Sequence, residues 1–96
     1  MARYVSLINW TEQGAKNFKE TTGRAADAAA LAGKMGGKLT VYWTLGAYDI
    51  VAISEFPDDQ TATAFLLRLG SLGNIRTQTM RAFDAQEMGG VISKTT

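Results

Sequence analysis

The sequence predicts an α+β domain in which two helices cover one face of a four-stranded antiparallel sheet. Four segments alternate apolar and polar residues with the period of two that strands show, and two longer segments repeat apolar residues at helical spacing. Their order along the chain is β-α-β-β-α-β, the split βαβ arrangement of a ferredoxin-like sheet. The 96 residues suit one domain over 1–96.

The first half of the chain holds a strand, a helical region and the start of a hairpin. Residues 2–10 alternate, with apolar groups on both faces, and Thr11 is a plausible N-cap for a short helix over 12–19. We expect Gly23 to end that helix, a second helix to run over 24–35, and the pair Gly36-Gly37 to end it.

The second half completes the pattern. Residues 38–44 and 48–56 read as strands joined by a turn at 45–47, and therefore as a hairpin. Pro57-Asp58-Asp59 opens a helix whose buried face is formed by Ala62, Phe65, Leu66, Leu69 and Leu72 and which stops at Gly73-Asn74. Residues 75–83 form the last strand, and Asp84 caps a short terminal helix.

Composition excludes several classes of function. Ten Lys and Arg nearly balance nine Asp and Glu and are scattered along the chain, so nucleic acid and anionic membranes are not expected partners. The absence of cysteine and histidine removes disulfides, thiolate nucleophiles, the usual zinc ligands and the commonest general base. We expect no metal and no cofactor. No apolar run suits a signal peptide or a membrane span, so a cytoplasmic protein is expected.

The sheet is expected to bury its second face against another copy of the chain. In this arrangement the helices leave one face of the sheet bare, yet the strands over 2–10 and 48–56 carry apolar side chains on both sides. About 800 Å² covered per subunit at roughly 25 cal/mol per Å² is a gross gain larger than the cost of association. We therefore predict a homodimer closed sheet to sheet, or a higher oligomer.

Several motifs resemble the GYD-domain family, which lies within the dimeric α/β-barrel group of ferredoxin-like folds. The matching stretches are SLINWTEQG, the helix start at Arg24, Gly36-Gly37, TLGAYDIV, EFPDD and GNIRTQTMRAF. They span almost the whole chain. The name-giving triplet is interrupted here, because Ala47 separates Gly46 from Tyr48-Asp49. The resemblance implies the dimeric barrel fold but no reaction, since the larger group includes monooxygenases, isomerases, haem proteins and small-ligand sensors.

Tyr48 and Asp49 are the candidate catalytic residues, and two interpretations of them stay open. In the first, Asp49 accepts N–H bonds of the turn while the Tyr48 ring packs at its edge. In the second, Asp49 points with Val51 and Ile53 into a partly apolar cavity, where desolvation would raise its pKa and make it a usable base.

Aromatic residues with polar neighbours at the strand ends are the candidate ligand site, which consists of Asn9, Trp10, Tyr42, Trp43, Tyr48 and Arg76. The same residue types suit a dimer interface. Arg76 and Arg81 are separated by an odd number of residues, so they must point to opposite faces of their strand and cannot serve one site. Helix capping accounts for Asp58 and Asp59, and no metal site is predicted there.

Three functional hypotheses follow. The first is a homodimeric binding or regulatory module whose sheet-to-helix cleft takes a small apolar or aromatic molecule. The second is a cofactor-free isomerase or monooxygenase with Asp49 as base and Tyr42, Tyr48 or Arg76 steadying an oxyanion. The third is a structural subunit of a larger assembly. An enzyme is the less favoured interpretation.

Overall fold

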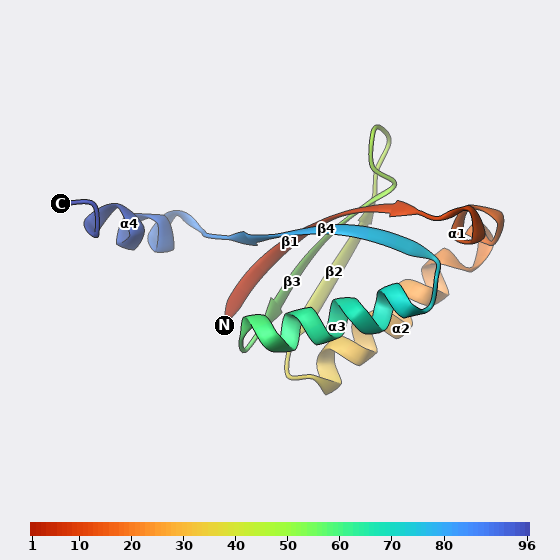
Figure 1. Ribbon diagram of the computed structural model, residues 1–96, viewed down its shortest axis with the longest axis horizontal. Coiled ribbons are helices and arrows are strands. Elements are labelled where there is room, and N and C mark those ends of the chain that lie inside the picture. The colour runs from red at the N-terminus through yellow and green to blue at the C-terminus, as the bar shows by residue number, and fades with distance from the viewer.

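The four strands form one antiparallel sheet in the order β2-β3-β1-β4, with helices α2 and α3 on one of its faces (Figure 1). This computed structural model describes residues 1–96. The elements follow one another as β1 (Ala2–Trp10), α1 (Glu12–Lys16), a 3₁₀ turn η1 (Phe18–Glu20), α2 (Thr21–Lys34), β2 (Lys38–Trp43), β3 (Ile50–Phe56), α3 (Asp59–Ser71), β4 (Ile75–Ala82) and α4 (Ala85–Ser93). The predicted β-α-β-β-α-β order and ferredoxin-like fold are confirmed.

The register of the sheet assigns alternate residues of each strand to the helices. Along β1 the even-numbered residues from Tyr4 to Ile8 are buried, and in β3 the partner residues from Ile50 to Phe56 follow the same alternation. The main core cluster joins Tyr4, Ala28, Ala32, Phe56, Ala62 and Phe65. Small alanines on α2 and a single phenylalanine on α3 therefore set how closely the two helices approach the sheet.

The helix boundaries differ from the predicted ones at the first helical region. The expected helix over 12–19 is divided into α1 and η1, and Gly23 lies inside α2 instead of ending a helix. The division falls at Asn17, whose φ of −102° and ψ of 33° lie outside the helical range. Gly14, inside α1, is buried so close to the Asn74 carbonyl that a Cβ there would overlap that oxygen. The expected stops at Gly36 and Gly73 are confirmed, and both residues have positive φ, 80° and 81°.

The remaining predicted caps and strands are close to the observed ones. Asp58 caps α3 through the Thr61 amide, and Asp84 forms a capping box with Glu87 at α4. Strand β3 starts at Ile50, two residues later than predicted, and the loop before it forms a long tip of the hairpin (Figure 1). Backbone bonds from Thr44 N to Asp49 O and from Asp49 N to Ile8 O hold the base of this tip.

The face of the sheet opposite the helices, called the open face below, is apolar along its middle. It carries the odd-numbered residues of β1 and β3 and the even-numbered residues of β4, and its apolar members are Val5, Leu7, Val51, Ile53 and Met80. Ile53 and Met80 are among the exposed large hydrophobic residues. The prediction that apolar groups occupy both sides of β1 and β3 is confirmed.

Helix α4 stands apart from the rest of the chain. Figure 1 shows it extending from the end of β4, away from α2 and α3. None of its residues is buried, and its apolar side chains Met88, Val91 and Ile92 are exposed. Arg3 holds only its beginning, through ion pairs with Asp84 at 3.6 Å and Glu87 at 3.2 Å. No helix of the chain combines the length and apolarity that a membrane crossing requires.

Candidate functional site

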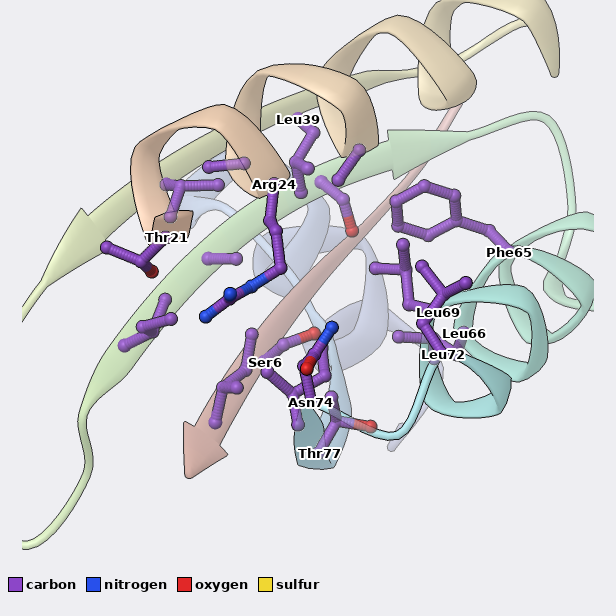
Figure 2. Close-up of a pocket in the computed structure, with 18 of the residues that line it drawn as sticks. Ser6, Thr21, Arg24, Leu39, Phe65, Leu66, Leu69, Leu72, Asn74 and Thr77 are labelled. Carbon is purple, nitrogen blue, oxygen red and sulfur yellow. The ribbon is translucent and has the colours of Figure 1, made fainter. Parts of the chain in front are cut away.

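A mainly apolar cleft lies between the helices and the covered face of the sheet (Figure 2). Its volume is about 80 Å³, and 13 of its 19 lining residues are hydrophobic. β1 and β3 supply its floor, including Ile8 and Ile50, and α3 supplies one wall through Leu66, Leu69 and Leu72. An opening of this size holds more than one water molecule, so it is larger than a packing defect.

Helix α2 forms the opposite wall of the cleft with residues spaced by three and four. Thr21, Arg24, Ala25 and Ala28 line the cavity and recur on one side of the helix. Because the two alanines are small, this wall does not reach across to α3, and space remains between the helices. Figure 2 shows the Arg24 side chain descending from α2 with its guanidinium turned away from the leucines of α3, which lie on the other side of the space.

Arg24 is the only charged residue that lines the cleft. Its side chain is 22% exposed, and its Nη1 lies 3.6 Å from Glu20 Oε2, a carboxylate whose side chain is 71% exposed. Nη1 also donates to the Asn17 carbonyl at 2.9 Å, and Nη2 donates to the Gly14 carbonyl at 3.4 Å. These bonds hold the guanidinium beside the segment that precedes α2.

Trp10 contributes an unsatisfied donor to the same region. Its ring lines the cleft, and its Nε1–H is buried without an acceptor. A buried donor left in this condition costs about 1–3 kcal/mol. The polar side chains nearby are neutral, and Ser6 Oγ shares a hydrogen bond of 2.8 Å with Thr79 Oγ1.

Comparison with known proteins identifies the family. The GYD-domain model matches residues 4–92. The chain belongs to the GYD-domain family. Among solved structures, the GYD-domain chain is similar to TTHA0845 from Thermus thermophilus, with 23% identity, a TM-score of 0.58, and 88% of this chain and 96% of that chain covered.

A second solved structure has less sequence in common but a similar shape. At3g17210 from Arabidopsis thaliana is 9% identical, with a TM-score of 0.65 and the same coverage of 88% of this chain and 96% of that chain. No match is found among curated proteins. At these identities the two solved structures support the fold of the GYD-domain chain alone.

The residues predicted for a ligand site do not all meet in one place. Trp10 lines the cleft, while Trp43 borders it by donating from Nε1 to Oγ1 of Thr21, a lining residue, at 3.0 Å. Asn9, Tyr48 and Arg76 gather in a polar hollow on the open face, which Trp10 also lines. Tyr42 projects from the open face of β2 and lines neither cavity.

The hollow on the open face is built by strand register. Asn9 and Arg76 are paired across β1 and β4, and the Tyr48 hydroxyl donates to Gln78 Oε1 at 3.2 Å. The prediction that Arg76 and Arg81 point to opposite faces is confirmed, since Arg81 lies on the helix side, 5.8 Å from the centre of the Tyr4 ring. The sequence predicts one site at the strand ends, whereas the structure divides these residues between the hollow and the cleft.

Asp49 joins two strands of the GYD-domain sheet. Its Oδ2 accepts a hydrogen bond of 2.9 Å from the backbone N–H of Trp10, and its own N–H donates to the Ile8 carbonyl at 3.0 Å. It therefore extends the pairing of β1 and β3 by one residue beyond β3. Gly46, with φ 147°, has a conformation that favours glycine, although Ala47 separates it from Tyr48. A role for Asp49 as a base stays a prediction.

Ionisable groups near the ends of the helices have shifted pKa values. Burial, reinforced by the hydrogen bond that its hydroxyl donates to Asp59 Oδ1 at 2.5 Å, raises the pKa of Tyr4 to about 12. Hydrogen bonds from Thr61 lower the pKa of Asp58, and the Glu87 amide, followed by Arg3, lowers the pKa of Asp84. These are capping and core effects outside the cleft. No three His, Cys, Asp or Glu side chains converge, so no metal-ion site is assigned.

The main residue that sequence reasoning missed is Arg24. The sequence analysis placed a helix start at Arg24, whereas α2 begins at Thr21, and it did not assign Arg24 to a site. The available signal was the spacing of Thr21, Arg24, Ala25 and Ala28, which puts an arginine among small residues on a face that should be buried. An arginine on such a face is an informative exception, because charged side chains are rarely buried without a partner.

Proposed function

We propose that this GYD-domain protein is a homodimeric binding module whose ligand, a small apolar or aromatic molecule, occupies the cleft between the helices and the sheet. The observation that carries the proposal is the apolar cavity of about 80 Å³. Its walls are mainly hydrocarbon and it is partly open to solvent, so an apolar molecule that enters it exchanges contact with water for contact with these side chains.

A screen of small molecules tests the binding proposal. Amide spectra of the uniformly labelled protein are recorded with a panel of aromatic and aliphatic fragments. Ligands are expected to shift the amides of Ala25, Ala28 and Leu69, which line the cleft. The amide of Lys94, at the far end of α4, reports on non-specific effects and should stay unchanged. If no fragment of the panel changes the chemical shifts of the cleft amides, the proposal is wrong.

The second copy is proposed to cover the open face. Val5, Leu7, Val51, Ile53 and Met80 form a continuous apolar surface there, and neither α2 nor α3 reaches it. An interface of about 1,600 Å², a little over half apolar, corresponds to roughly 20 kcal/mol of gross hydrophobic gain, which exceeds the roughly 4–15 kcal/mol cost of association. The hollow lined by Asn9, Tyr48 and Arg76 would then lie at the interface.

Features of helix α4 also favour a second copy of the chain on the open face. Helices as short as this one are not stable alone in water, and its apolar side, formed by Met88, Val91 and Ile92, has no cover within its own chain. The radius of gyration is 14.5 Å, against about 12.5 Å for a compact chain of this length. Arg3, which anchors α4, belongs to the open face. A copy seated on that face is within reach of α4.

Sedimentation of two matched variants tests the dimer. Ile53→Glu introduces a carboxylate into the middle of the open face, whereas Leu67→Glu introduces one on α3 at a side chain that is 70% exposed. The wild-type protein and L67E should sediment as dimers at micromolar concentration, and I53E as a folded monomer. A monomeric wild type, or a dimeric I53E, would contradict the proposed arrangement.

A further inference from the structure

We infer that the ligand of the cleft carries a carboxylate, which Arg24 binds, on an apolar body that the leucines of α3 enclose. The inference rests on the proposed function and adds the chemical class of the ligand. Its basis is the distribution of charge and of hydrogen-bond donors around the cavity.

The charge in the cleft has one sign. Of the 19 residues that line it, Arg24 is the only one with a charge, and none is Asp or Glu. The nearest carboxylate, that of Glu20, lies 3.6 Å from Nη1 and is mostly exposed, so solvent screens most of its attraction. The apolar floor and the wall of leucines lower the dielectric constant on the other side of the guanidinium. An anion in the cleft therefore gains more from Arg24 than it would in bulk water.

Arg24 retains donors for such an anion. A guanidinium has five N–H groups, and the carbonyls of Asn17 and Gly14 accept one each from Nη1 and Nη2. These two carbonyls fix the side chain from the segment before α2. The remaining donors suit the paired oxygens of a carboxylate, which arginine binds in a fork geometry. The guanidinium is thus held in position before a ligand arrives.

The other walls agree with an acid that has an apolar body. Leu66, Leu69 and Leu72 present hydrocarbon across from Arg24, as Figure 2 shows. Trp10, which also lines the cavity, has an indole N–H that lacks an acceptor and brings no negative charge. A cation would meet no carboxylate in the cleft. A fully neutral apolar guest would displace water from the guanidinium without replacing its hydrogen bonds, which is unfavourable.

A pair of isosteric probes tests the inference on the wild-type protein. Binding of 3-phenylpropionate and of its neutral amide, 3-phenylpropanamide, is measured at about pH 7 by calorimetry and by amide chemical shifts. Because the carboxylate offers the guanidinium an opposite charge and a second acceptor oxygen, which the amide lacks, the acid should bind about tenfold more tightly or better. The Arg24 Nε–H signal should move with the acid and stay in place with the amide.

Two variants with the same change of charge assign the effect to one side chain. Arg24→Gln should abolish the preference for the acid, so that both probes bind within about twofold of each other, because it removes the charge-assisted bonds. Arg68→Gln removes an exposed arginine of α3 that does not line the cleft, and should retain the preference. If R24Q does not fold, the affinity ratio and the Nε–H shift of the wild type still decide the question.

The outcomes separate this inference from the proposed function. If the two probes bind the wild-type cleft equally, or if R24Q keeps the preference for the acid, the carboxylate assignment is wrong while the binding module stands. If neither probe nor any fragment of the wider panel shifts the cleft amides, the binding proposal itself fails, and the assignment fails with it.

Discussion

Replacing Asp49 with alanine should destabilise the protein by breaking the contact between the hairpin tip and the end of β1. The Asp49 carboxylate accepts from the Trp10 backbone N–H at 2.9 Å in a partly buried position. Hydrogen bonds to charged groups contribute about 1.5–3 kcal/mol, and partial exposure puts this one at the lower end, about 1.5 kcal/mol. For a domain of this size that corresponds to a fall in melting temperature of about 6–12 °C.

Urea unfolding of wild type, D49A and D49N, all at one protein concentration, measures this effect. The asparagine side chain of D49N would keep an acceptor oxygen but lose the charge, so this variant should lose about half as much stability as D49A. Asp27→Asn removes a carboxylate from an exposed position on α2 and serves as the control. If D49A unfolds within about 0.5 kcal/mol of wild type, in the range of ordinary surface substitutions, the structural role is refuted. The carboxylate would then be free for the role of a base.

Three further predictions concern the core, a close contact and a cap. The pKa of Tyr4 is about 12 in the folded protein and 10.0 in the unfolded chain, so the free energy of unfolding is full below pH 10.0 and falls by about 2–3 kcal/mol as pH rises to 12. Urea unfolding at a series of pH values should show that Tyr4→Phe lacks this fall, and an unchanged pH dependence in the variant would contradict the assignment. Gly14→Ala should destabilise the protein by about 2 kcal/mol or more, because the new Cβ meets the Asn74 carbonyl. Gly23→Ala adds a Cβ in open space within α2 and should stabilise the protein by up to about 1 kcal/mol. Equal effects of the two substitutions on urea unfolding would count against the packing argument. The pKa of Asp58 is lowered from 3.8, so the stability that its cap gives α3 is complete above 3.8 and is lost as the pH falls through the lowered pKa. The Thr61 amide signal should therefore titrate below 3.8, and a pH-independent signal would rule out the cap.

Much of the fold could be predicted because it depends on local chemistry. Asp58 and Asp84 precede helices and cap them, and Gly36 and Gly73 take the positive φ that ends helices. The two-residue alternation assigned the faces of the strands correctly, including the apolar open face. Each of these signals lies within a few residues of the feature it predicts.

The errors occurred where distant segments meet. Gly14 and Asn74 lie far apart in the sequence, and helical spacing does not reveal the close approach of Gly14 to the Asn74 carbonyl. Asp49 fits the strand alternation in the sequence, but in the structure its carboxylate turns to the backbone of Trp10. The strand-end residues were predicted as one group, but Asn9 and Arg76 lie on the face opposite the cleft and Tyr42 lines neither cavity.

The order of residues by itself determined the family, the sequence of strands and helices, and the two faces of the sheet, because periodicity and capping act over a few neighbouring positions. Only the tertiary structure decided that a cavity lies between α2 and α3 and that Arg24 is its single charge. The width of that space depends on how alanines of one helix and leucines of another approach the same strands. Such a distance arises from packing between segments far apart in the chain, and no local pattern encodes it.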